Sequence, residues 1–211
     1  RQYQLKVFVQ TEYELREQQR DVAVEQLVLA QAGQFIRFDT QCIMPPGTIR
    51  TQQGDIYKVF TPFKRSWLAK LKEQGVHCYA RPKALPATNL QLALPELPAL
   101  KNGDNSSAQW PVAETQVLEL MRAFCREKVQ DYHKARDFPA IDGTSKLSAY
   151  LALGVVSPAQ CVARLQLEAA DSWQQDKSGA EVWLSELIWR EFYKHILLAY
   201  PDLIKHQPFQ A

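Results

Sequence analysis

The sequence has 211 residues, of which 46% are hydrophobic and 23% charged, a composition typical of a soluble globular protein. No apolar stretch approaches the roughly 18 residues that a membrane span needs, and the first residues lack the charged and apolar regions of a signal peptide. A formal net charge of +2 does not by itself indicate a nucleic-acid partner. We therefore expect a cytoplasmic protein that does not span a membrane.

Charge and cysteine positions are more informative than their totals. Between residues 57 and 83 there are seven Lys and Arg side chains against one acid, Glu73. Such a cluster is typical either of a surface that faces phosphates or of a solvated helix face. The four cysteines are scattered, without a C-x-x-C motif or a nearby His pair, so we expect free thiols and no metal site.

The first elements predicted are a strand, a helix and a second strand. Residues 5–9 form a short apolar run, residues 14–31 have the pattern of an amphipathic helix, and residues 35–38 resume the alternation of a strand. We expect Gly33 to end the helix in the left-handed conformation. A single βαβ unit cannot cover both faces of its sheet, so the chain is expected to enter partway through a doubly wound domain.

A basic helix and a proline-rich stretch follow. Residues 44–47 (Met-Pro-Pro-Gly) break the regular pattern, and residues 57–74 have the pattern of a basic amphipathic helix that begins near Thr61. Five of the twelve prolines fall between residues 82 and 111, together with the polar run 102–107. This composition predicts an interdomain linker.

The second half of the chain has a helical period throughout. Helices are predicted near residues 114–131, 146–153, 157–169 and 180–199. Ser157 followed by Pro158 is a strong start signal, because serine caps a helix and proline is favoured at its first position. We therefore expect an all-helical region after the linker.

The helix predicted at 180–199 carries the densest group of candidate site residues. At about 100° per residue, an arc of roughly 120° on one face holds Trp183, Glu186, Trp189 and Arg190. These side chains can belong to a core helix in which Glu186 pairs with Arg190 by the i, i+4 rule. Alternatively the face lines a cavity for a flat ligand with polar edges, since burying a carboxylate and a guanidinium without water is costly.

The turn from Gly143 to Ser148 directly precedes a helical stretch. Hydroxyl and backbone N–H groups at a helix N-terminus bind anions, and Lys146 adds a positive charge. The same pattern is also that of an ordinary N-cap, which needs only one hydroxyl. Upstream, Tyr132 can bind the same anion while Arg136 faces outward, or Arg136 can pair with Asp137.

These segments, in this order, resemble successive blocks of class I cyclobutane-pyrimidine-dimer photolyases, members of the photolyase/cryptochrome family. The matching blocks are residues 20–22, 57–64, 132, 136–139, 143–154, 157–158 and 183–193. The resemblance extends along nearly the whole chain, and the blocks are highly specific as a set.

This resemblance implies light-driven DNA repair. In the family, reduced FAD is excited by near-UV or blue light, directly or through an antenna, and passes an electron to a pyrimidine dimer flipped out of the helix, whose cyclobutane ring then splits. The fold class it implies is α/β plus all-α, with a doubly wound, Rossmann-like antenna domain before a helical FAD-binding domain. The expected division is residues 1–40 for the end of the antenna domain, 41–112 for the interdomain connection and 113–211 for the first helices of the FAD domain.

The resemblance also implies roles for single residues. The FAD phosphates are expected to be held by Tyr132, Thr144, Ser145, Lys146, Leu147 and Ser148. Trp183 and Arg190 are expected on the flavin side. Glu186 is expected to hydrogen-bond the dimer, Trp189 to stack on its bases, and Arg136 to contact a DNA phosphate. Lys146 stands where an arginine is frequent in the family, which keeps the charge but loses the planar fork.

An antenna chromophore, methenyltetrahydrofolate, is a further implied cofactor. Glu17 and Lys205 match positions connected with folate in some family members, while Arg16 and Ile204 replace an adjacent asparagine and a cysteine. The later family blocks, which supply further flavin contacts, are missing from this sequence. We therefore expect an internal fragment that is inactive alone, and a monomer when full-length.

Two other functions stay open. A cryptochrome would use the same flavin fold as a blue-light photoreceptor without repair. A cofactor-free helical binding module would instead bury the face from Trp183 to Arg190 as core. Glu186 and Trp189 favour repair of damaged DNA, because a dimer pocket needs a hydrogen-bonding carboxylate and a stacking surface together.

Overall fold

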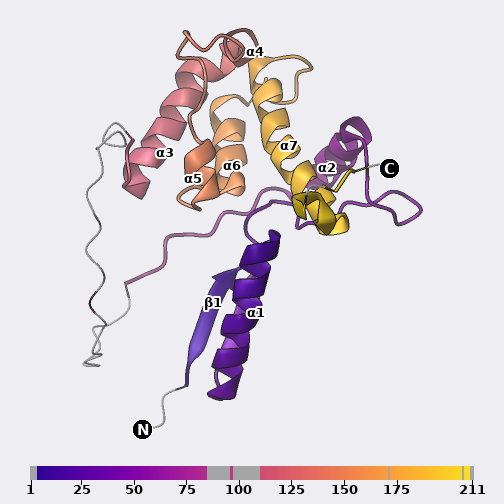
Figure 1. The fold of residues 1–211 in the computed structure, drawn as a ribbon. Helices are drawn as coiled ribbons and strands as arrows, with labels where there is room; N and C mark the ends of the chain where they lie inside the picture. The colour runs from indigo at the N-terminus through magenta and orange to yellow at the C-terminus, as the bar shows by residue number, and fades with distance from the viewer. Residues whose placement is uncertain (1–3, 85–95, 97–109, 171, 206, 210–211) are drawn as a thin grey trace.

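The computed structural model describes residues 4–84, 96, 110–170, 172–205 and 207–209. Figure 1 shows a small α/β unit at one end of the molecule and a group of helices at the other. Most of the predicted linker between residues 82 and 111 lies outside the described residues. The rest of the chain forms a mixed structure of helices and one small sheet.

The N-terminal part is the βαβ unit that the sequence predicts. Strands β1 (Lys6–Gln10) and β2 (Gln34–Phe38) are parallel neighbours, and α1 (Leu15–Ala30) connects them. Phe8 of β1 and Leu27 of α1 are 60% and 65% exposed. In a larger doubly wound domain, further elements would cover these large apolar side chains. The larger domain itself stays a prediction.

The end of α1 differs from the prediction. The left-handed residue is Ala32, with a φ of 54°, and not Gly33. The amides of Ala32 and Gly33 donate to the carbonyls of Leu29 and Val28, which is the bonding pattern of a Schellman motif. Gly33 is required for another reason: a Cβ atom there would lie 2.8 Å from the side chain of Val28 and 3.0 Å from the carbonyl oxygen of Leu5.

Helix α2 (Phe60–Gln74) begins one residue before the predicted start. Its buried side chains Phe63, Trp67 and Leu71 are spaced four apart and therefore form one stripe. Each stabilises the fold by about 1.5–3 kcal/mol through removal of apolar surface from water. The basic cluster that contains α2 is partly paired, because Lys64 forms an ion pair with Glu181.

The second half of the chain is helical in all of its described regular elements. These are α3 (Glu114–Ala123), a π-helical turn (Phe124–Lys128), a 3₁₀ turn (Val129–Asp131), α4 (Tyr132–Ala135), α5 (Ser148–Ala152), α6 (Pro158–Glu168), α7 (Gly179–Ala199) and a 3₁₀ turn (Pro201–Lys205). The start signal at Ser157 is confirmed as a capping box, in which Ser157 and Gln160 bond each other's backbone amides.

A single hydrophobic core joins α2 to the later helices. Met44 and Trp67 are fully buried in the same cluster as Leu184 and Ile188 of α7. Figure 1 shows α2 beside the lower half of α7. The segment that the sequence assigns to the interdomain connection therefore packs within the helical core, while the boundaries at residues 40 and 112 stay a prediction.

Helix α7 also holds the irregular segment 41–47 through two buried polar side chains. Glu191, 1% exposed, accepts hydrogen bonds from the amides of Ile43 and Met44 at 2.5 and 3.1 Å and from the indole nitrogen of Trp67 at 2.6 Å. His195 lies one helical turn after Glu191, is fully buried, and bonds the amide of Gly47 and the carbonyl of Met44. These contacts satisfy backbone groups that have no strand or helix partner.

The geometry at His195 fixes its tautomer. The Gly47 amide lies 3.1 Å from Nδ1 and can only donate, so Nδ1 must be the unprotonated acceptor. Nε2 therefore carries the proton and donates it to the Met44 carbonyl at 3.2 Å. Burial lowers the pKa of His195 to about 4; the Met44 carbonyl opposes this change, and Lys70 and Arg50 add to it.

We expect the His195 contact to be lost at low pH. Between the pKa of about 4 in the folded state and 6.5 in the unfolded state, only the unfolded chain binds a proton. The free energy of unfolding that His195 contributes is therefore fully present above pH 6.5 and falls as the pH drops toward 4, by on the order of 3 kcal/mol.

Urea unfolding of the wild type and His195→Gln between pH 4 and 7 measures this contribution. Glu191 titrates in an overlapping range, because burial raises its pKa to about 7, and the comparison of the two proteins cancels its effect. The difference in stability between wild type and variant should shrink as the pH falls. A constant difference would show that His195 does not change its protonation in this window.

Candidate functional site

The turn from residue 143 to 148 is set in place by its buried residues. Gly143 is buried against Ala135, and a Cβ atom on Gly143 would overlap the Cβ of Ala135. Leu147 is 1% exposed and anchors the turn in the core. Thr144 and Ser148 are exposed, and Ser145 is partly exposed. The hydroxyl groups of the turn therefore stay available to a ligand.

The turn directly precedes helix α5, as the sequence predicts, and its role in binding an anion stays a prediction. Helix α5 has only five residues, and its N-cap residue, Leu147, makes no side-chain capping bond. Lys146 adopts a left-handed φ of 54° and forms an ion pair with Asp142 at 2.8 Å. Lys128 pairs with the same carboxylate, and the two hydrogen bonds lower the pKa of Asp142 to about 2. The charge of Lys146 is thus partly neutralised within the protein.

The candidate residues of α7 do not pair with each other. Glu186 forms an ion pair with Arg136, and Arg190 donates to the carbonyl of Gln41. The i, i+4 pairing of Glu186 with Arg190 that a core helix would use is therefore wrong. Trp183 is 3% exposed and packs against the ring of Phe124, with 5.1 Å between the ring centroids.

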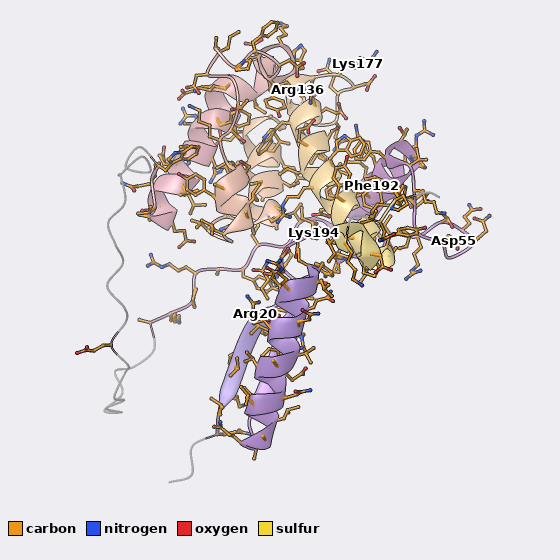
Figure 2. All side chains as sticks on the ribbon, viewed as in Figure 1. Arg20, Asp55, Arg136, Lys177, Phe192 and Lys194 are labelled. Atoms are coloured by element: carbon orange, nitrogen blue, oxygen red, sulfur yellow. The ribbon has the colours of Figure 1, made fainter. Side chains whose placement is uncertain are left out.

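Tyr132 and Arg136 are closely connected. The guanidinium of Arg136 lies 6.0 Å from the ring centroid of Tyr132, and it contacts Asp137 at 3.6 Å as well as Glu186. Burial raises the pKa of Tyr132, as does the nearby charge of Glu186. Arg136 thus turns toward α7, although more than a third of its side chain stays exposed to a possible partner. In Figure 2 the label of Arg136 lies beside the upper part of α7.

One cavity of about 690 Å³ joins the turn, α7 and the α/β unit. Its lining contains eight of the predicted cofactor residues together with Glu186: Tyr132, Thr144, Ser145, Lys146, Leu147, Ser148, Trp183 and Arg190. The volume lies within the range of roughly 300–1,000 Å³ that is usual for cofactor and ligand pockets. The predicted cofactor residues, from Tyr132 to Arg190, therefore share one concave surface with residues of the α/β unit.

The opposite wall of the cavity was missed by the sequence interpretation. It is formed by Glu12, Glu14 and Gln41, with Lys194 of α7 paired to Glu14 at 2.8 Å. Figure 2 shows Lys194 where α7 comes down to the end of α1. The ion pair with Lys194 lowers the pKa of Glu14, although burial opposes it. No local motif marks this wall, because it depends on how the α/β unit meets α7.

Trp189 lies outside the residues that line this cavity. Its indole stacks on Phe60 of α2, with 3.6 Å between centroids and 7° between planes, and it also contacts Phe192 and Tyr193. Trp189 and Glu186 therefore face different surroundings in this conformation. Glu186 lines this cavity and Trp189 does not, so the prediction that both residues contact the dimer stays a prediction.

The two residues expected to bind an antenna do not share a pocket in the described structure. Glu17 lines the large cavity at the start of α1. Lys205 lies in the last 3₁₀ turn and pairs with Asp202 at 2.8 Å. Among the described residues no helix is long and apolar enough to cross a membrane, and no group of three metal-binding side chains is found. The four cysteines are free thiols, and only Cys78 is exposed.

Sequence comparisons connect the chain to known proteins. Residues 4–87 match the family model described as DNA photolyase. The deoxyribodipyrimidine photo-lyase of Vibrio cholerae is 49% identical over 96% of this chain and 43% of that protein. The protein of the same name from Escherichia coli K12 is 40% identical over 97% of this chain and 43% of its own length. The chain thus spans less than half the length of these relatives.

Solved structures have the same fold. A class III photolyase from Agrobacterium tumefaciens superposes with a TM-score of 0.73 at 26% identity, over 94% of this chain and 42% of that protein. A Synechocystis cryptochrome superposes with a TM-score of 0.71 over 93% and 42%, and at 19% identity this likeness concerns the fold alone. The family model matches residues 4–87 and the relatives align with almost the whole chain, so the chain is similar to DNA photolyases along nearly its whole length.

Proposed function

We propose that the complete protein is a deoxyribodipyrimidine photo-lyase, which uses light and reduced FAD to split cyclobutane pyrimidine dimers in DNA. The observation that carries this proposal is the cavity shared by the 144–148 turn and the face of α7. Relatives that are 40–49% identical over almost all of this chain bear the name of this enzyme. The chain alone, at less than half their length, is proposed to be inactive.

The lining of the cavity fits FAD in its chemistry. The hydroxyls of Thr144, Ser145 and Ser148, with the phenol of Tyr132 and the charge of Lys146, suit the phosphates. Trp183 and Leu187 offer an aromatic and apolar wall to the flat ring system. When bound, reduced FAD supplies the electron that opens the cyclobutane ring.

The charge distribution sets the expected orientation of the cofactor. Glu12, Glu14 and Glu17 lie on the α/β side of the cavity, where phosphates would be repelled. The turn at residues 144–148 lies on the other side and carries Lys146. We therefore expect the phosphates at the turn and groups with N–H or O–H donors at the acidic wall.

DNA contacts are proposed for three residues. Glu186 is exposed and can hydrogen-bond the edge of a flipped base, and Arg136 can contact a phosphate once it leaves Glu186. Trp189 is proposed to stack on the dimer, with its indole taking a base in place of the ring of Phe60. DNA binding is thus expected to rearrange the Arg136–Glu186 ion pair and the Phe60–Trp189 stack.

The finer organisation is also part of the proposal. The βαβ unit would be the end of a Rossmann-like antenna domain, and residues 113–211 would begin the FAD domain. Glu17 and Lys205 would contact a folate antenna only if the complete protein brings the two residues together. The protein is proposed to act as a cytoplasmic monomer on damaged DNA.

A light-dependent repair assay on the protein from the complete gene tests this function. DNA with a defined thymine dimer should be restored under blue light and not in the dark, and the purified protein should show a flavin absorption spectrum. A flavin spectrum without repair would favour a cryptochrome-type photoreceptor. A colourless protein that cannot be reconstituted with FAD would instead support a cofactor-free helical module and contradict the proposal.

A further inference from the structure

Two consecutive residues of α7, Arg190 and Glu191, bond the backbone of the same short segment. Glu191 accepts the amides of Ile43 and Met44, and Arg190 donates to the carbonyl of Gln41. Gln41 is 8% exposed and lines the large cavity next to Arg190. The backbone between residues 41 and 44 therefore links a fully buried carboxylate to a guanidinium at the cavity wall.

The carboxylate of Glu191 fits its position closely. One oxygen accepts the amide of Ile43, and the other accepts the amide of Met44 and the indole nitrogen of Trp67. All three partners are N–H donors, so every bond requires an acceptor on Glu191. A glutamine could serve one of the two sides, but its NH₂ group would face a donor on the other.

Arg190 depends on the position of the Gln41 carbonyl. A guanidinium on a long side chain has many rotamers, and a fixed acceptor selects among them. The Gln41 carbonyl lies two and three residues before the amides of Ile43 and Met44, and Glu191 holds both of these amides in place. The charge of Arg190 also favours the ionised form of Glu191 by lowering its pKa, although burial raises that pKa more strongly.

We propose that Glu191 is a positioning residue that sets the orientation of Arg190 in the cavity through the backbone of residues 41–44. This inference rests on the proposed flavin site, because it assigns to Glu191 an effect on FAD binding without contact to the cofactor. Glu191 is absent from the cavity lining, so any such effect must pass through other residues.

A double-mutant cycle on the protein from the complete gene tests this role. FAD affinity is measured by titration of the apoprotein for wild type, Glu191→Gln, Arg190→Gln and the double variant. Each single variant should bind FAD about tenfold more weakly, and the double variant should be no weaker than Arg190→Gln alone, because coupled residues are non-additive. Glu181→Gln, a carboxylate of the same helix outside the cavity, is the control and should bind FAD as the wild type does.

Two results would overturn the inference. If Glu191→Gln lowers FAD affinity equally in the wild type and in Arg190→Gln, Glu191 acts on the fold in general and not through Arg190. If Glu191→Gln leaves FAD affinity unchanged, Glu191 has no role at the site. A crystal structure of Glu191→Gln provides a readout without flavin, in which the contact between Arg190 and the Gln41 carbonyl should be lost. If the wild type fails to bind FAD, the proposed function fails, and this structure still decides whether Glu191 positions Arg190.

Discussion

Replacing Trp189 with alanine is expected to weaken the binding of dimer-containing DNA by about 5- to 150-fold, since stacking of a base on an aromatic side chain contributes roughly 1–3 kcal/mol. Bound flavin should be retained, because Trp189 lies outside the cavity lining. Competition binding with damaged and undamaged duplexes, together with flavin absorbance, measures both effects. Glu186→Ala is expected to act in the same direction through loss of a hydrogen bond.

The aromatic neighbours of Trp189 sharpen this test. Phe60→Ala uncovers one face of the indole and should leave dimer affinity unchanged or higher, because the ring of Phe60 occupies the place proposed for a base. Trp173→Ala removes an indole outside the cavity and is the matched control. Loss of flavin with unchanged DNA affinity in Trp189→Ala would reverse the assignment and place this indole on the cofactor side.

Replacing Gly179 with alanine is expected to destabilise the protein by about 3 kcal/mol, at the upper end for an overpacked site. Gly179 is the first residue of α7 and lies against the 3₁₀ turn at Val129–Asp131. A Cβ atom on Gly179 would overlap the carbonyl oxygens of Val129 and Gln130. Backbone atoms cannot move aside as a flexible side chain can. Helix α7 would therefore shift away from the segment that leads into Tyr132.

Thermal unfolding and FAD titration of Gly179→Ala measure this effect together. The control is Gly54→Ala, because a Cβ atom on Gly54 meets nothing within 4 Å and only its φ of 88° opposes the substitution. That strain costs about 1–2 kcal/mol. Gly179→Ala should lose both stability and FAD affinity, while Gly54→Ala should keep its FAD affinity. Equal stability of the two variants would show that α7 can move away from the backbone of Val129 and Gln130 at little cost.

Local signals predicted the elements well where one residue type has one physical role. Ser157 and Pro158 mark the start of α6 because a hydroxyl cap and a fixed φ both favour a helix start. The end of α1 shows the limit of this approach, because the left-handed residue is Ala32 and not the predicted Gly33. Gly33 was required by the close approach of Val28, a contact that the pattern of the sequence does not show.

The sequence predicted part of the cavity lining, but neither its wall on the α/β side nor the pairings of its residues. Family resemblance and helical spacing together named the residues of the turn and of α7 that line one cavity. The partners of Glu186 and Arg190, however, are Arg136 and Gln41, which are 50 and 149 positions away. Spacing along a helix can suggest only local partners, so contacts between distant segments stayed hidden.

The buried pair Glu191 and His195 was also missed. The only signal in the sequence is that two polar residues, four apart, lie on the same side of a helix as buried apolar residues. Such residues indicate that backbone groups from elsewhere need partners, since buried polar groups are almost always hydrogen-bonded. The sequence alone cannot say that those groups belong to residues 43, 44 and 47.

Filling the cavity tests the central claim most directly. Ala152 of α5 lines the large cavity, and Ala159 of α6 lines a separate one of about 480 Å³. FAD titration of the protein from the complete gene should show no binding for Ala152→Trp and wild-type binding for Ala159→Trp. If Ala152→Trp bound FAD as tightly as the wild type does, the cavity between the 144–148 turn and α7 would not be the flavin site.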